Sequence, residues 1–414
     1  MSAPPLMSGT KTSIIGALLV ALGPISMALY TPAMPALVRV FDTDVSAVKL
    51  TLTVYFLGFA VAQLVCGPLS DTRGRRPVVL WFTGLYLAGS LIAVFAPSIE
   101  WLLAARLVQG VGAAAGIAIA RAIVRVLFVG RQSAQVMNMI ALMLMVAPAI
   151  APTLGGVTLQ FLGWREIFVL MALYGVAVIA IFYVTVPETL PPSAANEPRK
   201  RLVSSYATLI RDARFLRPAL SMACMLGAYY ALATVLPFVL IEGAGLTPVE
   251  FGFAMLSHTV AFMFGALMMR RLLKSIDAHR LVPVALWLIS VAVVLMVFAV
   301  TTYGPGLLTV MGPTALFSLG LPFAMPSMTT ASLAPFPHIA GAASALAGFL
   351  QMAIGLVGSA VAALMGDANL ALLTVLPVLL LASVVIHVAL RGATSRMEEA
   401  VADRIIHPHE VAAE

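Results

Sequence analysis

The feature that most constrains this chain is a series of long apolar runs separated by short polar segments. A bilayer core about 30 Å thick needs about 20 helical residues for one crossing. Backbone groups cannot stay unpaired in lipid, so runs of this length favour helices. We predict an all-α integral membrane protein with twelve spans. They lie near residues 12–34, 47–67, 77–96, 101–123, 135–159, 165–186, 217–241, 249–269, 281–302, 305–333, 338–364 and 369–390.

The composition excludes an ordinary water-soluble protein. Hydrophobic residues make up 61% of the 414 positions and charged residues only 10%, whereas a soluble domain carries roughly 25% charged residues. The net charge of +7 could point to nucleic acid, but the basic residues occupy short segments between apolar runs, so we expect the lipid bilayer and no nucleic acid as partner. Cys66 and Cys224 fall inside apolar runs, and we expect no disulfide framework, metal site or cofactor.

The distribution of basic residues predicts the orientation. With the N-terminus inside, all but four of the 24 Lys and Arg residues fall in or next to inside segments. The four others are Arg39, Lys49, Arg106 and Arg165. Because basic residues accumulate in cytoplasmic loops, we predict that both termini are cytoplasmic, in the cytoplasmic (inner) membrane of a bacterium. The first run has no convincing cleavage site and is expected to be a retained helix.

The spans divide into two pseudo-symmetric six-helix halves. The N-terminal half covers residues 1–186, a cytoplasmic linker 187–216, the C-terminal half 217–390 and a cytoplasmic tail 391–414. The linker is rich in proline and basic residues and has room for a short surface helix, but not for a catalytic domain. Two such halves are a common plan of transporters, whose substrate site lies between them near the middle of the bilayer. We therefore predict transport of a small molecule by a monomer.

The most specific motif is Gly-Pro-Leu-Ser-Asp-Thr-Arg-Gly-Arg-Arg at residues 67–76, in the first predicted inside loop. Its glycines permit tight turns and close helix approach. Its single carboxylate stands among three arginines, which suits a charge latch that closes a cytoplasmic gate. The alternative is a plain basic loop that only sets topology. The candidate gate residues are Gly67, Asp71, Gly74, Arg75 and Arg76.

This stretch resembles the signature loop of the major facilitator superfamily, in which the residue matching Asp71 helps to close the cytoplasmic gate. Arg106, Gln109 and Gly110 in the fourth span resemble the membrane-embedded arginine motif of that superfamily. The fifth span resembles the antiporter motif of its exporters. The residues of that match are Pro148, Pro152, Gly155 and Gly156. Small residues let helices touch and proline bends them, so plain helix packing is the alternative for this motif.

Together with residues 120–125, 163–165 and 342–351, these motifs are similar to the bicyclomycin/chloramphenicol-resistance (Bcr/CflA) branch, over nearly the whole chain. The resemblance implies the major facilitator fold, no enzymatic activity, and export of small drugs or metabolites in exchange for protons. Multidrug efflux with antibiotic resistance is thus the prediction. The alternatives are transport of one specific metabolite and facilitated transport without protons. A membrane-embedded enzyme would need clustered nucleophiles, metal ligands or paired carboxylates, and the sequence contains no such cluster.

Two positions depart from that branch, and both lack an expected carboxylate. Ala28 stands where members usually carry Asp in the first span, and Val126 stands where an Arg-Ala-Ile-Val-Arg run normally ends in Asp. None of the 17 acidic residues falls in the middle of a predicted span. Proton coupling usually relies on an intramembrane Asp, Glu or His, and imidazole titrates near neutral pH. His258, deep in its span, is therefore the proton-coupling candidate, with a neutral, hydrogen-bonded core histidine as the alternative.

Arg106 lies about six residues into its span, so about 9 Å below the membrane surface at 1.5 Å per residue. A guanidinium keeps its charge there and needs a partner. Backbone carbonyls, hydroxyls and water are one possibility, and an anionic or electronegative substrate group is the other. Small-molecule sites are mostly apolar with a few polar groups. The substrate-binding candidates are Tyr30, Tyr55, Phe59, Arg106, Gln109, Tyr229, Tyr230 and Gln351.

Overall fold

A computed structural model of the chain describes residues 7–128, 130–189 and 200–394, and leaves most side chains between residues 141 and 149 undescribed. Helices fill nearly all of the described chain, which contains no β-strand. The first half holds α1 (Gly9–Tyr30), η1 (Thr31–Ala33), α2 (Met34–Val40), α3 (Val45–Arg73), α4 (Arg75–Val94), α5 (Ile99–Ala113), α6 (Ala115–Leu127), α7 (Gly130–Phe161) and α8 (Trp164–Thr185). The second holds α10 (Ala213–Pro237), η3 (Phe238–Gly243), α11 (Pro248–Leu272), α12 (Ala278–Tyr303), α13 (Leu307–Leu333), η4 (Pro337–Ile339), α14 (Ala340–Leu364) and α15 (Ala368–Ala389).

Eleven spans within the described residues are long and apolar enough to cross a membrane. They correspond to eleven of the twelve predicted spans, so the all-helical membrane fold is confirmed. The remaining predicted span, near residues 135–159, corresponds to α7, which is 32 residues long and has undescribed side chains. The count of twelve therefore stays a prediction.

Three local expectations differ from the structure. The first span runs from Gly9 to Val40, because α1, η1 and α2 follow one another without leaving helical geometry. The fourth is divided into α5 and α6 at Ala114. The loop predicted at residues 67–76 is wrong in extent, because α3 continues to Arg73 and α4 begins at Arg75. Only Gly74 separates them, with φ of +95°, in the region that favours glycine.

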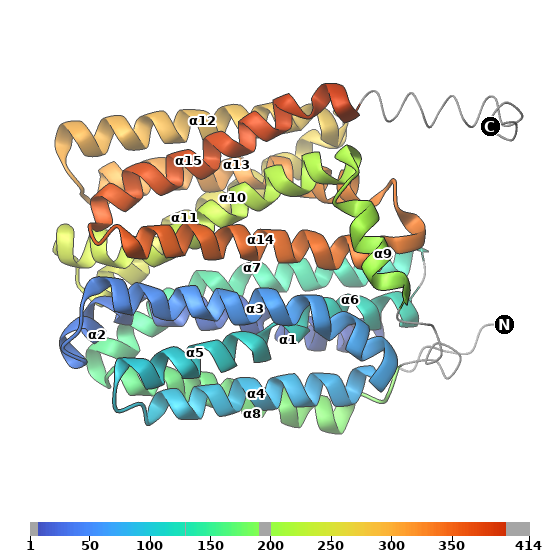
Figure 1. Cartoon of the computed structure of the whole chain (residues 1–414), viewed down its shortest axis with the longest axis horizontal. Helices are drawn as coiled ribbons and strands as arrows, with labels where there is room; N and C mark the ends of the chain where they lie inside the picture. The colour runs from blue at the N-terminus through green and yellow to red at the C-terminus, as the bar shows by residue number, and fades with distance from the viewer. Residues whose placement is uncertain (1–6, 129, 190–199, 395–414) are drawn as a thin grey trace, which may run out of the picture.

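The two halves form neighbouring bundles whose helices run along the long axis of the molecule (Figure 1). Each half has its own main apolar core, and Ala233, Phe238 and Met352 of the second half join the core of the first. The bundles meet along two helix pairs, α3 beside α14 and α7 beside α11. Between the halves, the short helix α9 (Lys200–Leu209) crosses one end of the molecule, where α1 begins and α15 ends. We name this the α9 end and the opposite one the α2 end.

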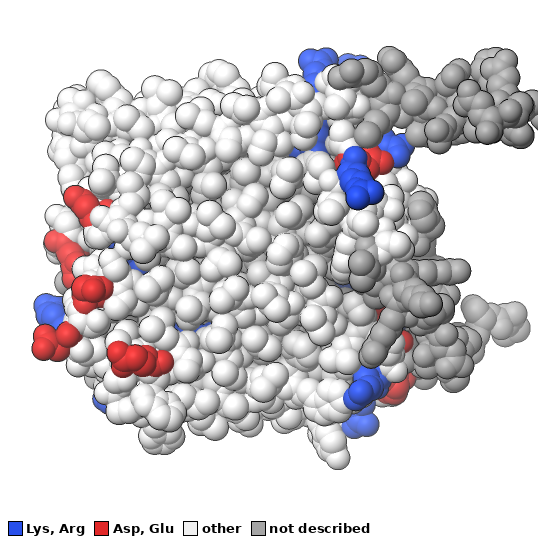
Figure 2. Space-filling view, in the orientation of Figure 1, with Lys and Arg blue, Asp and Glu red and all other residues white. Residues whose placement is uncertain are grey.

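Charged side chains gather at these two ends. Figure 2 shows Lys and Arg mainly at the α9 end, Asp and Glu mainly at the α2 end, and a wide band without charge between them. Large apolar side chains such as Phe253, Phe264 and Trp287 are exposed on the outside of the bundle. An apolar belt of this size would be unstable in water and is suited to lipid. The chain is therefore a multi-pass membrane protein.

Candidate functional site

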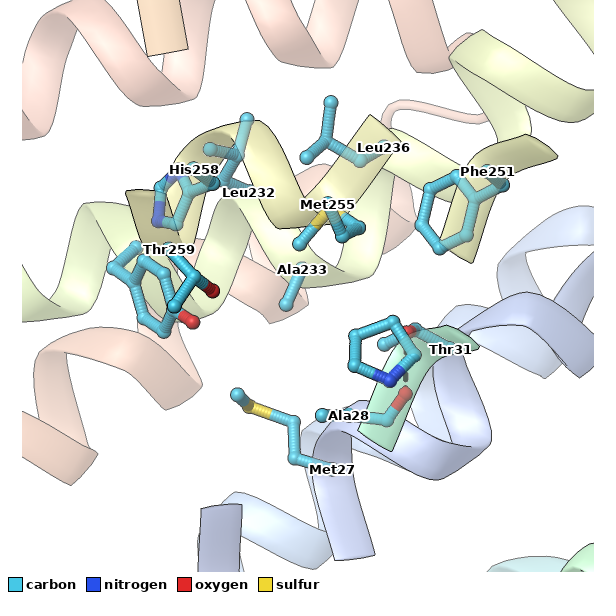
Figure 3. A pocket seen from close by; sticks show the side chains of 12 residues that line it. Met27, Ala28, Thr31, Leu232, Ala233, Leu236, Phe251, Met255, His258 and Thr259 are labelled. Atoms are coloured by element: carbon cyan, nitrogen blue, oxygen red, sulfur yellow. Dashed lines mark hydrogen bonds between the residues drawn. The ribbon is translucent and has the colours of Figure 1, made fainter. Parts of the chain in front are cut away.

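A small cavity lies between the two halves. The first half contributes Met27, Ala28, Thr31 and Pro152, and the second contributes eight residues of α10 and α11. Figure 3 shows Met27, Ala28 and Thr31 on one side of the cavity, opposite Leu236, Met255 and Phe251. None of the twelve lining residues is Asp, Glu, Lys or Arg. The lining is therefore mostly apolar with a few polar groups, as is typical of small-molecule sites.

His258 supplies the imidazole of this cavity. Its side chain is buried, its ring stacks on Tyr229 with centroids 5.1 Å apart, and Ser318 Oγ lies 2.5 Å from its Nδ1. Ser318 Oγ also donates to the carbonyl oxygen of Thr314 at 3.0 Å, so the hydroxyl has a lone pair for an imidazole N–H. His258 is thus both hydrogen-bonded in the core and in contact with the cavity, which keeps both of its predicted roles open.

Ala28 lines the same cavity from the other half. This is the position at which the motif comparison expects an Asp. The structure thus brings the missing carboxylate position and His258 to one cavity, although 230 positions of sequence separate them. An Asp side chain at position 28 would place its charge where this chain has a methyl group. Of the ionisable side chains, the lining of the cavity holds His258 and Tyr229.

Arg106 lies in a buried network inside the first half. It is completely buried, and its guanidinium carbon lies 4.4 Å from the ring centroids of both Tyr30 and Tyr55. Its Nη1 donates to Oε1 of Gln109, and Gln109 Nε2 donates to Ser90 Oγ at 2.8 Å. The tyrosine hydroxyls are also bonded, that of Tyr30 to Thr51 and that of Tyr55 to the carbonyl oxygen of Gly23.

These partners are of a kind that the sequence analysis missed. The expected partners were carbonyls, hydroxyls, water or substrate, whereas the charge is held between two aromatic faces and an amide. A planar guanidinium stacks well on such faces, and a desolvated cation–π pair stabilises by about 2 kcal/mol. The signal was present, since both tyrosines were singled out in neighbouring spans. Direct contact of Arg106 with substrate stays a prediction, and in this conformation Arg106 does not line the cavity.

The other predicted substrate residues are divided between the halves, with Phe59 in the first and Tyr229, Tyr230 and Gln351 in the second. Tyr229 lines the cavity, whereas Tyr230 packs on Phe56 with centroids 5.2 Å apart. Phe59 is buried beneath Gly23 of α1, where an added Cβ would lie 2.8 Å from its ring. Gln351 is half-buried in α14. Lining residues that the sequence analysis did not single out are Met27, Thr31, Phe251, Met255 and Thr259.

The predicted gate residues surround the turn between α3 and α4 at the α9 end. The carboxylate of Glu188 accepts hydrogen bonds from the backbone N–H groups of Arg75 and Arg76, both at 3.0 Å. Arg75 Nη2 lies 3.8 Å from Oδ1 of Asp71. Glu188 was not predicted, and its position suits the free N–H groups and positive dipole of a helix N-terminus. A carboxylate just after α8 therefore ties the end of that helix to α4.

The residues of the predicted exporter motif lie where α7 touches two other helices. A Cβ added to Gly155 would lie 2.2 Å from the carbonyl oxygen of Leu29 in α1, and one added to Gly156 would lie 2.2 Å from that of Pro248 in α11. Both distances are shorter than any ordinary contact, so each position requires glycine. Pro152 lines the cavity, and the side chain of Pro148 lies outside the described residues. The motif therefore packs α7 against α1 of its own half and against α11 of the other half, beside the cavity.

Comparison with known proteins agrees with this fold and with the motifs. The sequence profile of the Major Facilitator Superfamily matches residues 16–359. An uncharacterized MFS-type transporter of Bacillus subtilis (strain 168), YdgK, is 30% identical over 358 residues, which cover 84% of this chain and 87% of that protein. The bicyclomycin resistance protein homolog of Haemophilus influenzae is 28% identical over 356 residues, which cover 84% and 87% of the two chains.

Among solved structures, that of a D-xylose-proton symporter superposes with a TM-score of 0.73 at 14% identity, over 91% of this chain and 97% of that one. This likeness concerns the fold alone. The resistance-protein relative confirms the resemblance to the bicyclomycin/chloramphenicol branch that the motifs suggested. Since the family profile spans most of the sequence and the helices adopt the fold of a solved transporter, the chain belongs to the Major Facilitator Superfamily.

Proposed function

We propose that this chain exports small drugs or amphipathic metabolites across the bacterial cytoplasmic membrane, by alternating access and in exchange for protons. Membership of the superfamily makes it a membrane transporter and not an enzyme. The observation that carries the proposal is the apolar cavity that both halves line, with His258 in its wall. A site between two rigid halves can open to either side as they rock.

The distribution of charge supports an orientation for this export. Lys and Arg gather at the α9 end (Figure 2), and basic residues accumulate on the cytoplasmic side of membrane proteins. The α9 end is thus proposed to be cytoplasmic and the α2 end to face outward. The halves touch at both ends, through Arg121 Nη1, which donates to Ser344 Oγ at 2.8 Å at the α9 end, and through Gly156 and Pro248 toward the α2 end. Contacts at both ends support a conformation that is intermediate between the inward-open and the outward-open state.

Proton exchange is proposed to use His258. No carboxylate lines the cavity, and an imidazole that meets substrate and water in turn can bind a proton on one side and release it on the other. The position of Ala28 in the same cavity explains how a histidine could take over from the carboxylate that the branch usually carries there.

Transport in proteoliposomes tests this proposal. We would follow a panel of amphipathic antibiotics that includes bicyclomycin, with a proton gradient imposed and then collapsed. His258→Gln should reduce gradient-driven transport to the level without a gradient, because an amide cannot carry the proton. The matched control is His279→Gln, an exposed histidine at the start of α12, which should behave like the unmodified chain.

A facilitator without proton coupling is the second candidate. The observation that favours it is the cavity lining, which holds no Asp or Glu among its twelve residues. Transport that persists unchanged after the gradient is collapsed would support this candidate. A gradient response that survives His258→Gln would instead reject His258 as the coupling group. Transport of a single compound from the panel would favour a specific metabolite over broad drug export.

A further inference from the structure

Lys49 is a second buried cation of the first half, and neither the cavity nor the gate motif uses it. It is the fifth residue of α3, at the α2 end of the molecule, and its side chain is completely buried. Lys49 is one of the four basic residues that lie outside the predicted cytoplasmic segments. A buried ammonium costs free energy unless it is hydrogen-bonded or paired, so its partners identify what it does.

The partners that hold Lys49 all belong to the other half. Its Nζ donates to the carbonyl oxygen of Ala362 at 3.2 Å and to that of Gly366 at 3.4 Å, and it lies 5.5 Å from the ring centroid of Phe238. Ala362 is in the last turn of α14, Gly366 follows that helix, and Phe238 begins η3. Carbonyls at the end of a helix lack intrahelical partners and carry the negative end of its dipole, so they are suitable partners for an ammonium.

The charged groups around Lys49 come from both halves. Asp367, at the start of α15, and Glu242, in η3, attract it from the second half. Arg39, in α2, interacts with Glu242 from the first half. The two carboxylates attract Lys49 through space, whereas its ammonium donates hydrogen bonds to the two backbone carbonyls. The attraction of the two carboxylates therefore adds to the hold of the second half on Lys49.

We propose that Lys49 is the latch of the gate at the α2 end. It fastens α3 to the end of α14 while this end is closed, and its hydrogen bonds to the two carbonyls break when the halves separate there. The inference rests on the alternating access of the proposed function, but not on the substrate or on proton coupling. A latch of this kind sets the population of closed and open states, because its bonds exist in one state only.

The test measures the opening of the α2 end directly. Spin labels are attached to cysteines at Val40 and Leu364, the exposed last residues of α2 and α14, in the full-length chain with Cys66→Ala and Cys224→Ala. In reconstituted protein, Lys49→Met should increase the population with the longer distance about tenfold, because one charged hydrogen bond alone is worth about that factor. Lys49→Arg, which keeps the charge and the donors, should retain most of the closed state.

Arg165→Met is the matched control, because Arg165 is an exposed cation of the same half that stacks on Trp164 of its own half. If Lys49→Met fails to fold, the distance is measured in Lys49→Gln instead. That variant should also populate the longer distance. Distances equal to those of the unmodified chain in the variants that fold would overturn the latch, as would equal lengthening in Arg165→Met. Antibiotic export by the unmodified chain, measured in the same liposomes, tests the proposed function separately, so the two can fail independently.

Discussion

Arg106 and Lys49 are two completely buried cations in the same half, and they differ in what surrounds them. Arg106 is held by Tyr30, Tyr55 and Gln109, which all belong to its own half. Lys49 is held by Ala362 and Gly366 of the other half. One charge therefore strengthens a single bundle, whereas the other joins the two bundles that we propose separate during transport.

The chemistry of the two side chains matches this difference. A guanidinium is planar, keeps its charge and stacks between rings, which suits a permanent position in a packed core. An ammonium on a flexible chain makes point contacts with carbonyls and can exchange them for other oxygens. We expect changes at contacts within a half to lower stability, and changes at contacts between halves to shift conformation. The following predictions test that division, in order of decreasing effect.

Replacing Arg106 should have the largest effect on stability. Arg106→Ala removes the group between the rings of Tyr30 and Tyr55 and leaves a cavity, so the free energy of unfolding should fall by about 3 kcal/mol. Arg165→Ala is the control, because that arginine also lies 4.4 Å from an aromatic ring, that of Trp164, but is exposed. Arg165→Ala should lower the free energy of unfolding by less than about 1 kcal/mol. Denaturant titration in detergent gives both values, and equal losses would contradict a special role for the buried network.

Two glycines separate the effects of packing within and between the halves. A Cβ added to Gly110 would lie 2.1 Å from the carbonyl oxygen of Tyr55 in the same half, and one added to Gly156 would lie 2.2 Å from that of Pro248 in the other. Overpacking costs about 1–3 kcal/mol. Gly110→Ala should lower the free energy of unfolding by about that amount.

Gly156→Ala should instead push the halves apart and lengthen the distance between labels at Val40 and Leu364, with a smaller change in unfolding. If both glycine variants lower the free energy of unfolding and neither changes that distance, the halves do not behave as separate rigid bodies. That outcome would remove the basis of the comparison.

Glu188 should give the smallest effect. Its carboxylate accepts from the first two N–H groups of α4 within one half, and a helix cap of this kind stabilises by about 1 kcal/mol. Glu188→Gln keeps the shape and removes the charge, so the free energy of unfolding should fall slightly while the distance at the α2 end stays unchanged. A change in that distance would show that the turn between α3 and α4 communicates with the far end.

Much of the fold could be predicted from local patterns. The apolar runs predicted eleven membrane spans that the structure contains, and the motif at residues 67–76 predicted the family. The extent of that motif's loop was mispredicted, because Pro68 and Gly67 usually interrupt helices, yet α3 passes through both. Proline within a membrane helix is tolerated where neighbouring helices and side chains pair the freed groups.

The site was predictable by residue type more than by position. Tyr30, Tyr55, Arg106 and Gln109 were singled out together, and they do lie together, but as a network inside one half rather than on the cavity. Helical periodicity predicts which face of a helix is buried, but not which other helix packs against that face. Glu188 was missed because its partners are backbone N–H groups, which leave no trace in the sequence.

The sequence by itself determined the membrane environment, the order of the spans and the superfamily, because these depend on composition and on residues close together in the chain. Only the tertiary structure decided which partners each buried charge has. Lys49 and Ala362 are 313 positions apart, and no local pattern relates them. They meet because the two halves pack face to face along α3 and α14. A buried charge is costly unless it is paired, so the groups that this packing brings together determine its partners.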